Sequence, residues 1–168
     1  MKLWTLSLMA AALVAVSCST SEPVPEPDAQ VSAALAARAV ERACSKGCQT
    51  YDAVYVQDEL VKLGGPAREM PEETRSAISG LFDGIQFARG PALSDLFGED
   101  FLFAGGDGIL ISVGPVEELA EGVVGIDVGL ATARDSYFGE TYLFQWDGSN
   151  WIPATPEDAG VTVTSSVS

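Results

Sequence analysis

GVVGIDVGLATAR, residues 122–134, is the stretch that decides the fold. Large apolar residues alternate in it with small or acidic ones, which is the pattern of a β-strand with one buried face. The apolar positions are Val124, Ile126, Val128 and Leu130, and the positions between them are Gly125, Asp127, Gly129 and Ala131. Glycines on the second face permit curvature or the close approach of a helix. We therefore expect a strand that forms one wall of the core.

Three more strands are expected around this one, separated by short connections rich in turn-forming residues. They are GILISVGPV at 108–116, ETYLFQW at 140–146 and WIPA at 151–154. Asp147-Gly148 suits the last turn, because both residue types tolerate positive φ. Trp146 and Trp151 flank that turn and either pack across the two strands or form an aromatic platform for a carbohydrate. The second half of the chain therefore predicts an antiparallel β-meander.

The first half of the chain is helical in character. Asp28 is suited to cap a helix that reaches Lys46 and stops at Gly47. Pro71 is suited to begin a second helix, which ends before Gly84. Shorter elements are expected around these helices: strands over 50–56 and 85–87, and a helical turn over 93–97. Helices followed by a meander predict an α+β fold, in which N-terminal helices pack on a curved antiparallel sheet.

The order of these elements, the chain length and the closing hairpin YLFQWDGSNW, residues 142–151, resemble the cone-shaped folds of the nuclear-transport-factor-like and cystatin-like groups. The resemblance implies a bent sheet that wraps a helix, with a pocket between them that enzymes and pure binding proteins both use. Asp127 and Tyr142 are the candidate pocket residues. Asp127 stands among apolar neighbours, where a carboxylate is either solvated or perturbed by burial.

The N-terminus has the layout of a secretory signal. Lys2 precedes an apolar run over 3–16, which at about 14 residues is shorter than the roughly 20 that a spanning helix needs. Ala15-Val16-Ser17-Cys18 resembles a bacterial lipobox, although Ala15 stands where that family usually has leucine. The resemblance implies that Cys18 is acylated and becomes the first residue of a mature protein that is lipid-anchored in the bacterial cell envelope and exposed on the extracytoplasmic side. The alternative is ordinary cleavage, which leaves an unmodified Cys18.

The chain has three cysteines, Cys18, Cys44 and Cys48. An odd number in an exported protein leaves one thiol to explain, and acylation of Cys18 would explain it. Cys44 and Cys48 are then expected to form a disulfide, with reduced core thiols as the alternative. A structural zinc site needs four nitrogen or sulfur ligands, and the chain contains no histidine, so we expect no metal or cofactor.

Three regions follow from these observations: a signal peptide over 1–17, a lipid-anchored tether over 18–30 and one globular domain over 31–168. The tether is rich in proline and glutamate and is expected to be semi-rigid. Its stretch over 19–29, at about 3.1 Å per residue in an extended proline-rich conformation, reaches roughly 34 Å, which would hold the domain clear of the bilayer.

The charge of the chain limits its partners. There are 24 acidic and 9 basic residues, and removal of the signal takes away Lys2, which leaves a net charge of −16. So acidic a surface repels nucleic acid. Without histidine the usual catalytic triads are absent. We therefore expect a non-catalytic binding or structural protein of the cell envelope, with a small-molecule pocket protein or enzyme, or an inhibitor-type binder of another secreted protein, as alternatives.

Overall fold

The computed structural model describes residues 23–45, 47–62, 66–98, 103, 106–133, 136–163 and 166–167. The predictions about the signal over 1–17, about Cys18 and about Lys46 concern positions outside these residues. Within the described part of the chain, no helix is both long and apolar enough to cross a membrane.

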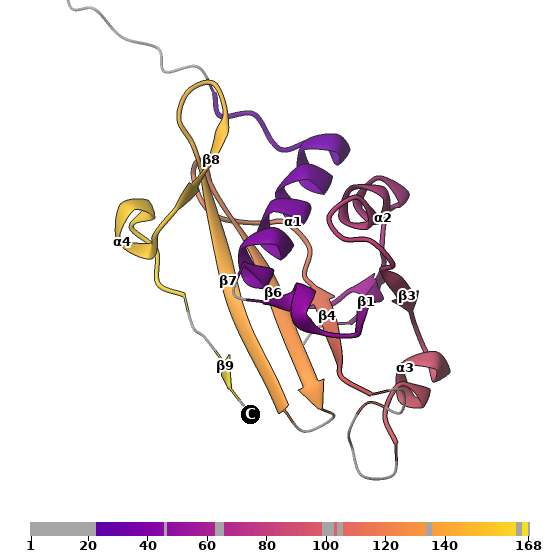
Figure 1. The fold of residues 1–168 in the computed structure, drawn as a ribbon. Helices are drawn as coiled ribbons and strands as arrows, with labels where there is room; N and C mark the ends of the chain where they lie inside the picture. The colour runs from indigo at the N-terminus through magenta and orange to yellow at the C-terminus, as the bar shows by residue number, and fades with distance from the viewer. Residues whose placement is uncertain are drawn as a thin grey trace, which may run out of the picture.

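An open mixed sheet forms the centre of the fold, with its strands in the order β2-β1-β4-β6-β7-β8 (Figure 1). These strands are β1 (Ala53–Leu60), β2 (Arg68–Glu69), β4 (Gly108–Val113), β6 (Val123–Ala133), β7 (Ser136–Trp146) and β8 (Trp151–Ala154). The run from β4 through β6 and β7 to β8 is antiparallel throughout, which confirms the predicted meander. β1 lies parallel to β4, so the whole sheet is mixed rather than purely antiparallel.

Three short strands extend this sheet at its margins. β3 (Gln86–Ala88) pairs in parallel with β1, β5 (Glu117–Ala120) pairs with β6, and β9 (Ser166–Val167) pairs with β7. β5 continues the direction of β4 along β6 after a break at Gly114. The amide of Gly114 donates to the carbonyl of Asp127 over 2.7 Å, and a Cβ at this glycine would lie 3.2 Å from the Asp127 Cβ. A side chain at this break would therefore pack tightly against Asp127.

Helix α1 (Ala29–Cys44) covers one face of the sheet, which we call the helix face (Figure 1). Asp28 caps it as predicted, because its Oδ1 accepts a hydrogen bond of 2.8 Å from the Val31 amide. The buried side of the helix is mostly alanine, with Leu35 and Val40 as its larger members. Small side chains let the helix approach the strands closely. The N-terminal helix α1 therefore packs on the sheet, as the sequence predicts.

The remaining helices are short. α2 (Glu72–Ser79) packs beside α1 and ends at Gly80, earlier than the predicted end before Gly84, so Leu81 and Phe82 join the core from a loop. The other short helices are η1 (Cys48–Thr50), α3 (Pro91–Asp95) and α4 (Pro156–Ala159). Because η1 occupies 48–50, β1 begins at Ala53 rather than at Thr50, where the strand was expected.

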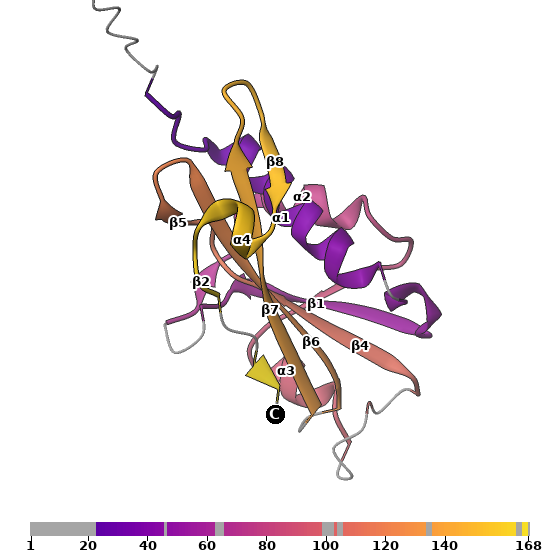
Figure 2. The same ribbon diagram turned by 90° about the vertical axis from the view of Figure 1, so that its left-hand side faces the viewer.

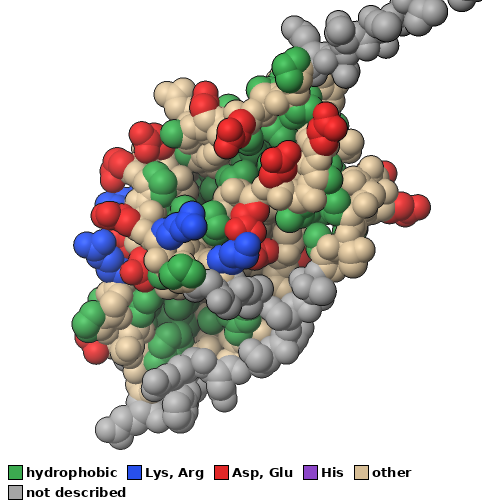
Figure 3. Space-filling model, turned by 180° about the vertical axis from the view of Figure 1, so that it is seen from behind, with side chains coloured by type: hydrophobic (Ala, Val, Ile, Leu, Met, Phe, Trp, Pro, Cys, Tyr) green, Lys and Arg blue, Asp and Glu red, His purple; other side chains and the backbone are tan. Residues whose placement is uncertain are grey.

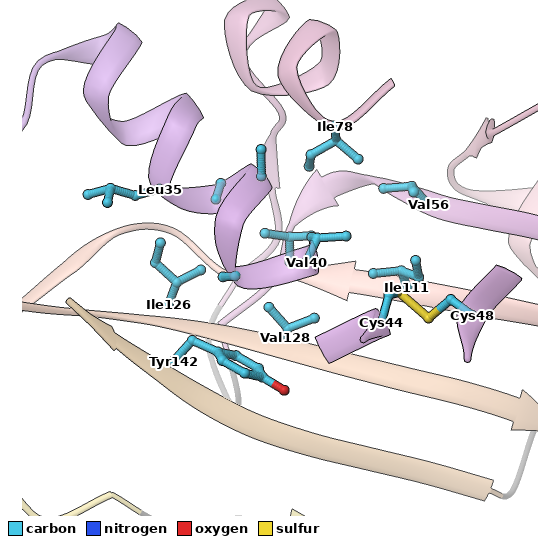
Figure 4. Close-up of a cluster of buried hydrophobic side chains, with 14 of the residues drawn as sticks. Leu35, Val40, Cys44, Cys48, Val56, Ile78, Ile111, Ile126, Val128 and Tyr142 are labelled. Atoms are coloured by element: carbon cyan, nitrogen blue, oxygen red, sulfur yellow. A yellow bond between two sulfur atoms is a disulfide. The ribbon is translucent and has the colours of Figure 1, made fainter. Parts of the chain in front are cut away.

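Apolar side chains fill the space between α1, α2 and the sheet (Figure 4). The completely buried members of this core include Val40, Val56, Ile78, Ile111, Val113, Ile126, Val128 and Phe144. Val124 is also buried and Leu130 is half-buried, so the predicted apolar face of β6 is the face that meets the helix. The pocket that the cone-fold resemblance implies between helix and sheet is occupied by these side chains.

Candidate functional site

The segment over 23–28, which we call the strap, lies against the domain instead of extending away from it. It runs along the end of the molecule that contains the β5–β6 and β7–β8 turns before it enters α1 (Figures 1 and 2). Val24 is half-buried and packs against the core. A Cβ at Gly122, in the β5–β6 turn, would lie 3.4 Å from a Val24 methyl group. Part of the predicted tether is therefore a structured element of the domain.

A hollow of about 660 Å³ opens between the strap, the first turns of α1 and the β7–β8 hairpin. We call it the strap hollow. Its lining is mainly apolar, with a polar margin, and includes Val31, Leu35, Arg38, Trp146, Trp151 and Ile152. Its volume lies within the roughly 300–1,000 Å³ of small-molecule sites. A smaller hollow of about 260 Å³ lies on the other side of the strap, between Val24, Val116 and Glu118.

The two tryptophans beside the strap hollow pack against each other across β7 and β8. Their ring centroids are 5.7 Å apart and their planes are inclined by 56°. Trp151 is 8% exposed, and its carbonyl accepts a hydrogen bond of 3.3 Å from Arg38 Nη1. Cross-strand packing is therefore their arrangement, and Trp151 does not present the open ring face that a carbohydrate platform needs.

Asp127 lies on the outer face of the sheet, away from α1. Its Oδ1 accepts a hydrogen bond of 2.6 Å from the Thr141 hydroxyl, directly across the β6–β7 pair. The carboxylate is half-buried in a hollow of about 170 Å³ that Glu117 and Thr162 also line. This hollow is too small for most metabolites, and among the described residues one side-chain hydrogen bond, from Thr141, holds Asp127 in it.

Tyr142 lies on the helix face, at the edge of the core. Its hydroxyl donates to Glu140 Oε2 over 3.1 Å, and the Arg42 guanidinium lies 5.3 Å from its ring centroid. Burial, followed by the charge of Glu140 and this hydrogen bond, raises the pKa of Tyr142 to about 12, against the opposing effect of Arg42. The phenol is therefore neutral near pH 7 and serves as a donor to the carboxylate.

Asp127 and Tyr142 do not share a pocket. Asp127 pairs with Thr141 across the strands, whereas Tyr142 pairs with Ile126, and successive residues of a strand point to opposite faces. The two candidate pocket residues therefore lie on opposite faces of the sheet. Each of the two side chains makes a hydrogen bond within the sheet, Asp127 with Thr141 and Tyr142 with Glu140.

The glycines of β6 are approached by side chains on the outer face and not by a helix. The Tyr137 hydroxyl and ring lie over Gly129, in the place that a Cβ would occupy. Leu119 lies in the same way over Gly125, with its Cδ1 2.7 Å from the position of a Cβ. The sequence correctly predicted a close approach but not the elements that make it.

Cys44 and Cys48 form a disulfide, as predicted, with their Cα atoms 4.8 Å apart. Both residues are buried, at 5% and 3% exposure. The bond ties the last residue of α1 to η1, directly before β1. Its position inside the core indicates a structural role.

Charged groups on the surface pair locally. Among the described residues, no three acidic or cysteine side chains converge in a way that would hold a metal ion. On the face that Figure 3 shows, several basic side chains lie next to acidic ones. The ion pairs are Lys62–Glu117 at 2.7 Å, Arg75–Asp58 at 2.6 Å, Arg75–Glu72 at 3.3 Å and Arg89–Glu69 at 3.7 Å. These pairs place three basic side chains against four acidic ones, so they leave little net positive charge to attract an anionic ligand.

Comparisons with protein-family models, with curated protein sequences and with solved structures find no match for the chain. The resemblances to lipoprotein precursors and to cone-shaped folds stay predictions. The strap is the feature that sequence reasoning missed. Its signal was Val24, an apolar residue between the prolines of a segment that otherwise contains acids.

Proposed function

We propose that this chain is an exported protein of the bacterial cell envelope, anchored by lipid at Cys18, and that it binds a partner or ligand without catalysis. The observation that carries the proposal is the disulfide between Cys44 and Cys48. With Cys44 and Cys48 joined, Cys18 is the remaining thiol of the chain, and it stands at the end of a lipobox-like sequence. Acylation would consume this thiol, and a disulfide suits an oxidising compartment outside the cytoplasm.

The binding role rests on the strap hollow. It combines a largely apolar lining with Arg38 and a few polar groups at its margin, which is the usual composition of a binding site. Arg38 is held in place by the Trp151 carbonyl. The sequence contains no histidine, which is the commonest general base in enzymes. We therefore favour a binding role over a catalytic one.

Mass spectrometry of the mature N-terminus tests the anchor. We expect a diacylglyceryl group on Cys18, and we expect Cys18→Ser to move the protein from the membrane fraction to the soluble fraction. The double variant Cys44→Ser/Cys48→Ser is the matched control, because it removes two thiols and leaves the lipobox intact. An unmodified Cys18, or a chain cleaved beyond it, contradicts the proposal.

A second test addresses the strap hollow as a site for a small apolar ligand. The dye 1-anilinonaphthalene-8-sulfonate combines an apolar ring system with an anionic group that Arg38 would attract. We expect saturable binding that Ala34→Phe abolishes, because Ala34 is an exposed residue in the lining. Ala29→Phe, at an exposed helix position outside the lining, should bind the dye normally. Equal binding by both variants would remove the hollow from the proposal.

A further inference from the structure

We propose that the docked strap turns the domain so that the end formed by the β5–β6 and β7–β8 turns faces the lipid bilayer at close range. This inference rests on the lipid anchor proposed above and concerns the surface that the anchor presents to the membrane. Its partner is the headgroup layer of the bilayer itself.

The length of free chain sets the distance. From Cys18 to Val24 there are six residue steps, which span at most about 20 Å when fully extended. If the strap were free as far as Asp28, ten steps would allow about 35 Å. Docking of Val24 therefore removes four of the ten steps, about two fifths of the reach, and fixes the point at which the chain leaves the domain.

Contacts at both ends hold the strap in place. At its start, Val24 packs at Gly122, whose Cβ position is also 3.8 Å from the Trp146 Cβ. At its end, the Ser32 hydroxyl donates to the Pro27 carbonyl over 3.3 Å, and Asp28 caps α1. The prolines of the strap restrict the unfolded segment, so docking costs less conformational entropy than it would for a flexible sequence.

The surface around the exit point is suited to the edge of a bilayer. Leu119 and Ile152, at 42% and 43% exposure, are large apolar side chains on strands that meet these two turns. Glu118, Glu121 and Asp147 lie in the same region and are acidic. Acidic groups are repelled by anionic lipids, so the surface fits zwitterionic headgroups, with apolar contacts from the two exposed side chains.

Both tryptophans that remain after removal of the signal, Trp146 and Trp151, lie at this end, so the native chain carries its own probe. The purified lipoprotein is reconstituted into phosphatidylcholine vesicles that contain a small fraction of dansyl-labelled headgroups. We expect energy transfer from tryptophan to dansyl in the native chain and a loss of transfer in Val24→Ser. Glu26→Gln, a change at an exposed strap position, is the matched control and should transfer normally.

A variant with about ten Gly and Ser residues inserted after Ser19 serves as a control, because the insertion adds roughly 18 Å of mean reach. A fall in energy transfer in this variant shows that the assay detects a domain that lies farther from the bilayer. Equal transfer from native and Val24→Ser chains, with transfer reduced by the insertion, overturns the inference.

If the proposal of a lipid anchor is wrong, the mass spectrum will show an unmodified Cys18. Docking of the strap can then still be measured on the lipid-free protein. Val24→Ser should shift tryptophan emission to the red and lower the melting temperature, whereas Glu26→Gln should do neither. No change in Val24→Ser would show that the strap does not dock, whatever the state of Cys18.

Discussion

Tyr142 connects three charged or polar groups at the edge of the core: its own phenol, the Glu140 carboxylate and the Arg42 guanidinium. Arg42 also lies 6.0 Å from the Phe144 ring centroid. The aliphatic part and the charge of Arg42 thereby cover two aromatic rings of β7 from α1. This arrangement closes the core between the helix and the strand without a large apolar residue at the surface.

The raised pKa of Tyr142 predicts a loss of stability at high pH. The phenol ionises near pH 10 in the unfolded chain and near pH 12 in the folded chain. The folded state therefore holds the proton more tightly, and the stability that this provides is complete below pH 10 and is lost as pH rises towards 12. We expect the free energy of unfolding to fall more steeply over this range in the native protein than in Tyr142→Phe.

Ultraviolet absorbance of the phenolate provides the direct measurement. Tyr142→Phe should remove a transition near pH 12, and Glu140→Gln should move that transition to lower pH by removing the neighbouring charge. Removal of a transition near pH 10 instead would contradict the burial of this phenol.

Gly129 gives a second prediction at the residue scale. An alanine at this position would place its methyl group against the Tyr137 ring and hydroxyl and close to the Ser112 hydroxyl. Overpacking of this kind costs about 1–3 kcal/mol, so we expect Gly129→Ala to lower the free energy of unfolding in urea by that amount. The cost should shrink in a Tyr137→Ala background. An equal cost in both backgrounds would mean that the tyrosine does not set the requirement for glycine.

Among the elements, the junction of α1 with β1 depends on the Cys44–Cys48 disulfide. The loop that it closes is about five residues long, for which chain entropy predicts a stabilisation of about 2 kcal/mol. We expect Cys44→Ala/Cys48→Ala to lose about this much in a urea titration, because alanine leaves no unpaired polar group in the core. The native chain with its disulfide reduced should lose a similar amount. No loss in either form would show that the ordered junction is maintained by packing alone.

The elements differ in how far the sequence determines them. β6 was predictable because its alternation of large and small residues states which face is buried, and α1 was predictable because Asp28 marks its start. Each of these signals is local, because it is contained in a few consecutive residues of the element that it predicts. The parallel pairing of β1 with β4 was not predictable. Val54 and its partner Ile109 are far apart in the chain, and no local sequence pattern indicates that they pair.

The same limit applies to the candidate site. Asp127 was singled out as an acid among apolar residues, and the structure places it half-buried beside Thr141 on the outer face of the sheet. Tyr142 was chosen for its chemistry, but only the strand register reveals that it points to the opposite face. The strap hollow needs the strap, α1 and the β7–β8 hairpin together, so no single stretch of sequence could indicate it.

At the scale of the whole molecule, 24 acidic residues outnumber 9 basic ones, and basic side chains on the face that Figure 3 shows lie next to acidic ones. The Lys62–Glu117 pair is largely exposed, with 53% of the lysine side chain accessible, and exposed pairs of this kind contribute about 0–1 kcal/mol. Local pairing therefore offsets only a small part of the repulsion among the excess acids.

This balance predicts that salt stabilises the folded protein. A chain with a net charge of −15, or −16 after removal of the signal, repels itself more strongly when compact than when unfolded. At 0.1 M salt the screening length is about 10 Å, which weakens repulsion between distant acids more than attraction within close pairs. We expect the melting temperature to rise between low salt and 0.1 M sodium chloride, by about 2–4 °C for each 1 kcal/mol of repulsion removed.

Magnesium chloride at equal ionic strength is the control and should give the same rise if the effect is screening alone. A fall in melting temperature would mean that close ion pairs outweigh the net charge, and a larger rise with magnesium would mean that the acidic surface binds a divalent cation specifically.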